Sequence, residues 1–309
     1  MNFKKPKFWD DSRLSFWSLI LYPFSLLFLF ASLIIKLLKT QKKFSIPIIC
    51  VGNIYVGGTG KTPLAIEIFK IIKSNEKNPG FIKKGYDYLY DEIQMLKKNG
   101  ETFTNKNRKK AISSLILSGH NVAILDDGFQ DHSIKKDINI LCFNKKQLIG
   151  NGMVIPSGPL REGLNSIKRA HIIIINGSKD SFFEKQIFNI SEDIQIYYAK
   201  YLPINIEFLR GKNLCAFAGI GNPNNFFELL SEYNLNVQKK IAFPDHYAFN
   251  EKEIKEMTEE ANKNNFELIT TEKDFYRIKD IGFNKLKYLK IDIEVKGKNN
   301  LMSEILSHL

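Results

Sequence analysis

Hydrophobic residues along the chain follow three kinds of pattern. From Leu14 to Ile35 there is no charged residue, and this stretch is long enough for a membrane helix. Beyond it, short continuous apolar runs alternate with segments of helical spacing, such as Thr62 to Lys73. Continuous apolar strands alternating with helices predict an α/β protein with a mostly parallel sheet, covered by helices on both faces.

The apolar runs predicted as strands of a first block are 46–51, 81–82, 121–127, 138–143, 172–175 and 194–198. A helix is expected around 109–118. A second block begins with a strand near Asn213, continues with a helix at about 224–231, and ends with a strand near 288–293. We therefore expect an N-terminal membrane-associated helix in residues 1–40, a core domain in 41–205, and a smaller α/β domain in 206–309.

The N-terminal apolar segment has basic residues on both sides, so the positive-inside rule gives no orientation. The basic residues are Lys4, Lys5, Lys7 and Arg13 before it, and Lys36, Lys39, Lys42 and Lys43 after it. A cleaved signal peptide is disfavoured because the apolar stretch is too long and lysines stand where small residues should precede a cleavage site. A spanning helix, a helix that enters one leaflet with a kink at Pro23, and a buried core helix all remain open.

The chain is strongly basic, with a formal net charge of +12 over 309 residues. Such an excess favours anionic partners such as a membrane surface or phosphorylated substrates, although a lysine-rich composition bias explains it equally well. Nucleic acid is not expected, because no patch of arginine interleaved with aromatic residues is present. The cysteines Cys50, Cys142 and Cys215 are too far apart for a zinc site or a disulfide framework.

A glycine-rich segment, VGNIYVGGTGKTP, follows the first predicted strand and precedes a predicted helix. Strand, glycine loop and helix form the context of a phosphate-binding loop. Tyr55 stands where the usual pattern has its first glycine. The phosphate oxygens are expected to contact the backbone N–H groups of Gly57, Gly58, Thr59 and Gly60. Lys61 is expected to reach the β- and γ-phosphates, and the Thr62 hydroxyl to bind Mg²⁺.

The run NVAILDDGFQ is a predicted buried strand that ends in Asp126 and Asp127. This is the arrangement of a Walker-B element, in which an aspartate reaches Mg²⁺ directly or through water. Because adjacent strand residues point to opposite faces, we expect the two carboxylates to have different tasks. Motifs that recognise guanine are absent or in the wrong order, so ATP is expected rather than GTP.

Six motifs together resemble the tetraacyldisaccharide 4'-kinase family of lipid A synthesis. They are VGNIYVGGTGKTP, LDDGFQDH, NGMVIPSGPLREGL, FAGIGNP, FPDHYAF and LITTEKD, in family order. The resemblance implies a P-loop core, a smaller C-terminal domain and a bacterial inner-membrane enzyme with its catalytic domains on the cytoplasmic face. It implies transfer of the γ-phosphoryl group of ATP to the 4'-hydroxyl of a tetraacylated glucosamine disaccharide 1-phosphate, giving lipid IVA.

The resemblance also assigns residues. It implies that Asp91 is the catalytic base and that His246 supports it. It implies that Arg161 and Glu162, with Asp126 and Asp127, handle phosphate and Mg²⁺. The family usually reads S-R-G-Y-G, followed by a long excursion and then G-D-E-P. Here KKGYD at 83–87 is followed almost at once by Asp91, so we expect that a flap has been deleted.

Two other classes of function fit parts of this pattern. One is a membrane-associated P-loop switch ATPase that regulates a protein partner, but such proteins usually carry a second lysine where Val56 stands. The other is a non-enzymatic membrane adaptor with a degenerate nucleotide fold, which the intact Lys61, Thr62 and paired aspartates argue against. The expected partners are thus the lipid disaccharide and an anionic membrane, with no obligate protein partner.

Overall fold

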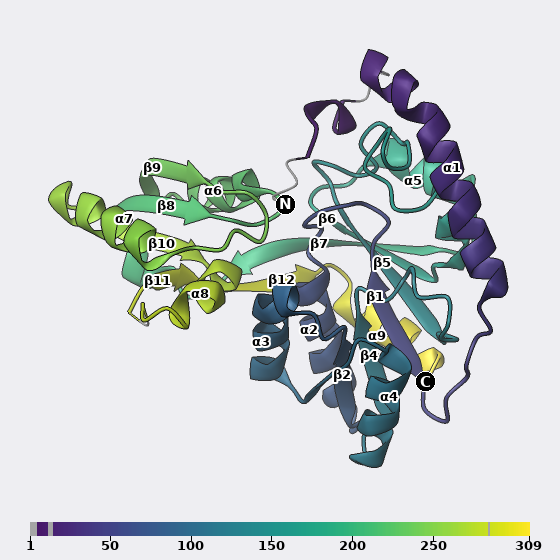
Figure 1. The fold of residues 1–309 in the computed structure, drawn as a ribbon. Helices are drawn as coiled ribbons and strands as arrows, with labels where there is room; N and C mark the ends of the chain where they lie inside the picture. Colours follow the sequence, from purple (N-terminus) through teal and green to yellow (C-terminus); the bar gives the residue numbers. More distant parts are fainter. Residues whose placement is uncertain (1–4, 12–14, 284) are drawn as a thin grey trace. The chain divides into compact units, whose positions relative to one another are not determined.

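The structure is a computed structural model that describes residues 5–11, 15–283 and 285–309. The predicted first residue of the apolar segment, Leu14, and the flanking Lys4 and Arg13 lie outside the described residues. The helices are α1 (Phe16–Leu38), α2 (Lys61–Lys73), α3 (Tyr90–Asn99), α4 (Arg108–Leu117), α5 (Ser181–Phe188), α6 (Pro223–Glu232), α7 (Glu251–Lys263), α8 (Glu272–Lys279) and α9 (Lys298–Ser307). Figure 1 labels them along the ribbon.

The strands that the structure describes lie in two sheets. They are β1 (Ile48–Gly52), β2 (Pro79–Lys83), β3 (Thr102–Thr104), β4 (Val122–Asp126), β5 (Ile138–Asn144), β6 (Ile172–Asn176), β7 (Gln195–Pro203), β8 (Asn213–Ala218), β9 (Asn236–Ala242), β10 (Glu267–Thr271), β11 (Lys287–Leu289) and β12 (Ile291–Val295). The predicted α/β class with a mostly parallel sheet is confirmed by this arrangement.

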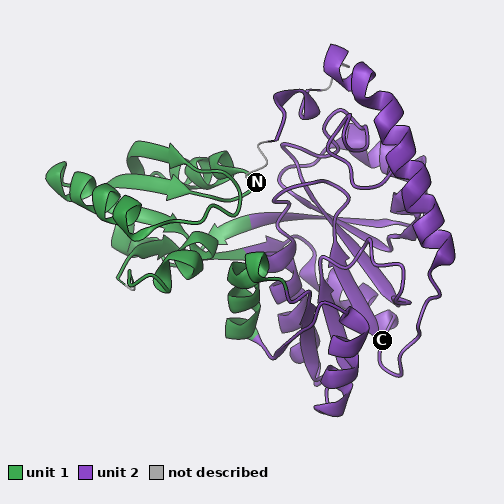
Figure 2. Ribbon diagram, in the orientation of Figure 1, with its two compact units in different colours: residues 1–4, 86–99, 201–292 green, residues 5–85, 100–200, 293–309 purple. Residues whose placement is uncertain are grey.

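The chain divides into two compact units, coloured separately in Figure 2. Of the described residues, the smaller unit contains those in 86–99 and 201–292, and the larger contains those in 5–85, 100–200 and 293–309. The units are therefore discontinuous in sequence, whereas the expected domains, 41–205 and 206–309, follow chain order. Residues 86–99 group with the C-terminal segment, and the last residues, 293–309, group with the core.

The sheet of the larger unit has the strand order β12-β7-β6-β5-β1-β4-β2-β3. Strand β1 pairs in parallel with β4 on one side and β5 on the other, and β4 pairs in parallel with β2. The carboxyl ends of β1, β2 and β4 thus meet at one edge of the sheet. In open parallel sheets, ligands bind at this edge.

Helices cover both faces of this sheet. Side chains of α4 and α5 belong to one buried cluster with Ile48, Ile82 and Leu125. Phe81 points to the opposite face, because neighbouring strand residues alternate. There its ring stacks on Phe69 of α2 with centroids 4.6 Å apart. Burial on both faces explains why the strands are continuous apolar runs instead of alternating ones.

Helix α1 is apolar around most of its circumference and carries two buried residues, Ser18 and Ser25. Ser15 caps its N-terminus by accepting a hydrogen bond from the backbone N–H of Ser18, at 3.1 Å. The Ser25 hydroxyl lies 2.8 Å from the carbonyl of Val154 and from the Ser157 hydroxyl. The helix is long and apolar enough to cross a membrane, and only 11% of its most apolar window is buried. Its Ser18 and Ser25 side therefore packs on the rest of the larger unit, while most of its apolar surface is exposed.

The smaller unit is a parallel sheet in the order β11-β10-β8-β9 with helices on both faces. Helix α6 packs on the face that carries Leu214 and Ala216. Helix α7 packs on the other face, against Cys215 and Phe217. Helix α8 starts directly after β10 and contacts α3. Because α3 belongs to the same unit as residues 201–292, its side chains can contact side chains of that C-terminal segment.

Candidate active site

The glycine-rich loop of the larger unit joins β1 to α2. Gly57 and Gly60 have φ values of 125° and 90°, in a region that favours glycine. The Asn53 side chain holds the loop from within, because its amide donates to the Tyr55 carbonyl at 2.6 Å and to the Thr59 hydroxyl at 2.9 Å. The loop ends at the N-terminus of α2, where backbone N–H groups and the helix dipole favour an anion. Its conformation is thus that of a phosphate cradle.

Tyr55, the residue that replaces the first glycine of the loop, is fully buried. Its hydroxyl makes a short hydrogen bond to the Asp10 carboxylate and accepts one from Lys5 Nζ, at 3.0 Å. Burial, together with the Asp10 carboxylate, raises the pKa of Tyr55, so the phenol stays protonated. Tyr55 therefore links the glycine-rich loop by hydrogen bonds to the segment that precedes α1.

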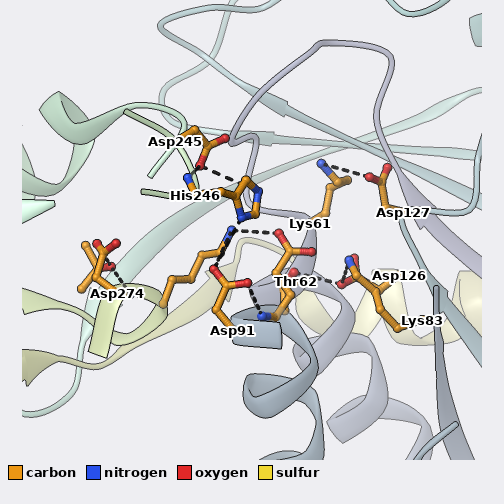
Figure 3. Close-up of polar contacts among 12 residues, drawn as sticks. Lys61, Thr62, Lys83, Asp91, Asp126, Asp127, Asp245, His246 and Asp274 are labelled. Carbon is orange, nitrogen blue, oxygen red and sulfur yellow. Dashed lines mark hydrogen bonds and ion pairs between the residues drawn. The ribbon is translucent and has the colours of Figure 1, made fainter. Parts of the chain in front are cut away.

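The two aspartates where β4 ends, Asp126 and Asp127, have different partners. Asp126 is fully buried, and its Oδ2 accepts hydrogen bonds from the Thr62 hydroxyl at 2.9 Å and from Lys83 Nζ at 2.7 Å. Asp127 has a φ of 60°, and its carboxylate lies 2.9 Å from Arg161 Nη1 and 3.8 Å from Lys61 Nζ. Figure 3 shows Thr62 and Lys83 directed at Asp126 and Lys61 directed at Asp127.

This part of the larger unit provides ligands that suit Mg²⁺. The cation prefers oxygen ligands, and the Thr62 hydroxyl and the Asp126 carboxylate supply them. Asp126 Oδ1 is buried and has no hydrogen-bond partner among the described residues. Over the same residues, no group of three or more His, Cys, Asp or Glu side chains forms a ready-made metal site. Thr62 and Asp126 therefore fit a cation that is bound mainly through the phosphates of a nucleotide.

Asp127 and Glu162 are the remaining expected metal ligands, and for both this role stays a prediction. The contacts of Glu162 are of a different kind from those of Asp126. Its carboxylate makes a short ion pair with Arg169 Nη2 and lies 4.0 Å from His132 Nε2. Burial and the positive charge of Arg169 lower the pKa of His132 to about 4, so the imidazole is neutral at pH 7. These contacts tie Glu162 to Arg169 and His132, and its role as a metal ligand stays a prediction.

In the smaller unit, Asp91 lies in the first turn of α3 and is 1% exposed. Its Oδ2 accepts a hydrogen bond from Arg277 Nε at 2.9 Å and a shorter one from Nη2 of the same guanidinium. Its Oδ1 accepts from the Glu92 backbone N–H at 2.8 Å. Lys273 Nζ is 3.9 Å from Oδ2. The carboxylate is thus held in one orientation by charged groups from α8.

His246 lies beside this carboxylate. Its Nδ1 is 3.9 Å from Asp91 Oδ2, which is too long for a hydrogen bond, and has no hydrogen-bond partner among the described residues. The backbone is in the left-handed region, with a φ of 54°, and its N–H donates to the Gly219 carbonyl at 3.1 Å. Burial and the nearby Lys273 ammonium lower the pKa of His246. A neutral imidazole that can accept a proton is therefore aimed toward Asp91, as Figure 3 shows.

Three functional candidates were not singled out from the sequence. Lys273 and Arg277 are four residues apart on α8 and so lie on one face of it. Their spacing in LITTEKDFYRI, which also contains Asp274, was the sequence feature that could have indicated a charged cluster. Lys83 gave no local signal, because its role depends on the neighbouring strand β4.

The chain is similar to proteins of one known family. The family model described as tetraacyldisaccharide-1-P 4'-kinase matches residues 17–99 and 88–309. A tetraacyldisaccharide 4'-kinase of Pelagibacter ubique is 43% identical over 312 residues, covering 99% of this chain and 98% of the relative. One of Brucella anthropi is 33% identical over 298 residues, covering 88% and 86%. A crystal structure of LpxK from Aquifex aeolicus in complex with ATP has the same fold, with a TM-score of 0.72 and 24% identity over 94% of this chain and 99% of that one.

Proposed function

The chain belongs to the tetraacyldisaccharide-1-P 4'-kinase family, and on that premise we propose that it phosphorylates the 4'-hydroxyl of a tetraacylated glucosamine disaccharide 1-phosphate with ATP. The enzyme is a kinase of lipid A biosynthesis. The observation that carries the proposal within the chain is the phosphate cradle, with Lys61 at its end and Thr62 bonded to Asp126. A switch ATPase shares the cradle, but the family membership favours the lipid kinase.

The larger unit handles the nucleotide in this proposal. The backbone N–H groups of the loop from Gly57 to Gly60 bind the β- and γ-phosphates, and Lys61 neutralises charge on them. Thr62 and Asp126 would hold Mg²⁺, which would neutralise charge on the phosphate oxygens. Asp127 and Arg161 form an ion pair in which the guanidinium is available to the transferred phosphoryl group.

The smaller unit supplies the groups that act on the acceptor. The 4'-oxygen forms a bond to the γ-phosphorus, and the bond from that phosphorus to the bridging oxygen of ADP breaks. The proton of the hydroxyl passes to Asp91, whose carboxylate is held in place by Arg277. His246 supports this step as a neutral imidazole. Because little covalent chemistry is asked of the protein, positioning and charge stabilisation supply most of the rate.

A membrane location follows from the same proposal. The acceptor carries four acyl chains and stays in a bilayer, so the enzyme works at the membrane surface. The apolar side chains of α1 that are exposed include Trp17, Leu27 and Phe30, and Lys39, Lys42 and Lys43 follow the helix as exposed residues. Each basic residue near an anionic surface contributes about 1 kcal/mol. We place the catalytic units on the cytoplasmic face of the bacterial inner membrane, where ATP is available.

The test is phosphate transfer. The protein is incubated with ATP labelled at the γ-phosphate, Mg²⁺ and the disaccharide 1-phosphate in detergent micelles. The proposal predicts label in the lipid, in proportion to ADP formed. ADP formation without labelled lipid contradicts it and favours the switch ATPase.

A further inference from the structure

Lys83 is a charged residue at the end of a central strand. It is the last residue of β2, which pairs in parallel with β4 so that Ile82 lies opposite Leu125. The next residues along the two strands are Lys83 and Asp126, whose side chains therefore emerge on the same side of the sheet. The Lys83 side chain is 1% exposed and the Asp126 side chain 0%. An ammonium so deeply buried has a cost in free energy that a surface role would not explain.

The contacts of Lys83 hold one oxygen of Asp126. Lys83 Nζ lies 2.7 Å from Oδ2, and the Thr62 hydroxyl donates to the same oxygen at 2.9 Å. The other oxygen, Oδ1, is buried and has no hydrogen-bond partner among the described residues. Two donors on Oδ2 fix the rotation of the carboxylate, and the proton of Thr62 is directed away from its lone pairs. The arrangement thus leaves Asp126 Oδ1 and the Thr62 lone pairs for another group.

We propose that Lys83 is a positioning residue of the Mg²⁺ site: it anchors Asp126 through Oδ2 so that Oδ1 is the oxygen available to the cation or to water bound to it. This inference rests on the proposed use of Mg²⁺ and ATP. Groups that hold a metal ligand without touching the metal typically change metal affinity or activity by about 10- to 100-fold when removed. The ammonium also offsets the charge of a buried carboxylate, which is costly to leave unpaired.

Three variants and one control separate this role from two others. The variants are Lys83→Met, Asp126→Asn and the double variant, which removes both charges of the pair. The control is Lys298→Met, because Lys298 Nζ also pairs with a buried carboxylate of the larger unit, that of Glu67, at 2.5 Å. A fluorescent ATP analogue is titrated into each protein in EDTA and in excess Mg²⁺. The readout is the dissociation constant in EDTA divided by that in Mg²⁺, so a lower ratio means that Mg²⁺ strengthens binding less. Thermal unfolding is followed alongside.

The proposal predicts that Lys83→Met lowers this ratio by about tenfold or more, with little change in EDTA. It predicts that Asp126→Asn lowers the ratio and that adding Lys83→Met has no further effect, because Lys83 acts through Asp126. Lys298→Met should leave the ratio unchanged. An unchanged ratio in Lys83→Met would show a purely structural role. Equal weakening with and without Mg²⁺, or losses that multiply in the double variant, would show direct contact with phosphate.

The experiment remains informative if Lys83→Met does not fold. In that case Asp126→Asn and the double variant, which leaves no unpaired buried charge, still test the proposal: an unchanged ratio in Asp126→Asn, or a further loss in the double variant, would contradict it. A wild-type ratio near one would also overturn the proposal. No acceptor is present in this experiment, so its outcome is independent of whether the enzyme phosphorylates the lipid disaccharide.

Discussion

The guanidinium of Arg277 is expected to contribute strongly to the stability of the smaller unit. It donates to Asp91 Oδ2, to Asp274 Oδ1 at 3.0 Å and to the Gly219 carbonyl at 2.8 Å. Both carboxylates are buried, at 1% and 0% exposure, and Arg277 itself is 12% exposed. Replacing it by methionine keeps much of the side-chain volume and removes every one of these donors.

The expected loss in the free energy of unfolding depends on which hydrogen-bond donors each carboxylate retains in Arg277→Met. Asp91 keeps the Glu92 N–H and a Lys273 ammonium 3.9 Å away. Asp274 keeps the Thr271 hydroxyl at 2.6 Å and the Gly219 N–H at 3.1 Å. Removing one partner of a buried ion pair costs about 3–5 kcal/mol. Because both carboxylates retain a donor, we expect Arg277→Met to cost about 3 kcal/mol, at the lower end of that range.

The assay must report on the smaller unit alone, because a chain with two units need not unfold in one step. Hydrogen exchange followed by mass spectrometry gives the opening free energy of β8 and β10 separately. The matched control is Arg210→Met. Arg210 pairs with Glu207 at 2.9 Å in the same unit, but the two side chains are 56% and 80% exposed. A surface pair of this kind contributes about 0–1 kcal/mol.

The reasoning would be refuted if Arg277→Met lowered the opening free energy of β8 and β10 by less than about 1 kcal/mol, or by the same amount as the control variant. It would mean that the Asp91 carboxylate is held by the backbone and Lys273 alone. The proposed orientation of the catalytic base by Arg277 would then lose its physical basis.

Three further predictions concern catalysis, the membrane and pH. Asp91→Ala should lower the rate of phosphate transfer by about 10²–10⁴-fold with ATP binding retained; a near-normal rate would place the base elsewhere. Replacing Leu27 and Phe30, which are 65% and 63% exposed, by glutamate removes about 1.5–3 kcal/mol of apolar burial per site. Binding to anionic vesicles should weaken at least about tenfold, and unchanged co-sedimentation would argue against α1 as the membrane contact. The unfolded chain protonates His132 near its ordinary pKa and the folded chain only near pH 4, so stability should fall as the pH drops between these values. His132→Gln should reduce that fall by up to about 3 kcal/mol in urea titrations, and identical pH profiles would contradict it.

Local features of the chain were predictable from sequence because their physics is local. The strand, glycine loop and helix around Lys61 follow from an apolar run, residues that allow positive φ, and helical spacing. The paired aspartates at the end of β4 were predictable because the apolar run of this strand ends directly in two carboxylates. The fold class follows from continuous apolar strands that alternate with helices.

Pairings between distant segments were not predictable. Arg277 and Asp91 are 186 positions apart, and they meet only because α3 leaves the first block and packs on α8. Neither a local charge pattern nor an apolar period encodes that path. Lys83 illustrates the same limit, since its partner is fixed by which strand lies beside β2 and in what register. The sequence resemblance named Asp91 without naming the groups that hold it.

The most direct measurement of the central claim uses two acceptors that differ at one position. Tetraacylated disaccharide 1-phosphate with a free 4'-hydroxyl and its 4'-deoxy analogue are each incubated with the enzyme and γ-labelled ATP in mixed micelles. We expect labelled product from the first acceptor, with a mass increase of one phosphoryl group, and none from the second. Equal labelling of the two acceptors, or ADP release with no labelled lipid from either, would contradict the assignment of this chain as a kinase of the 4'-hydroxyl.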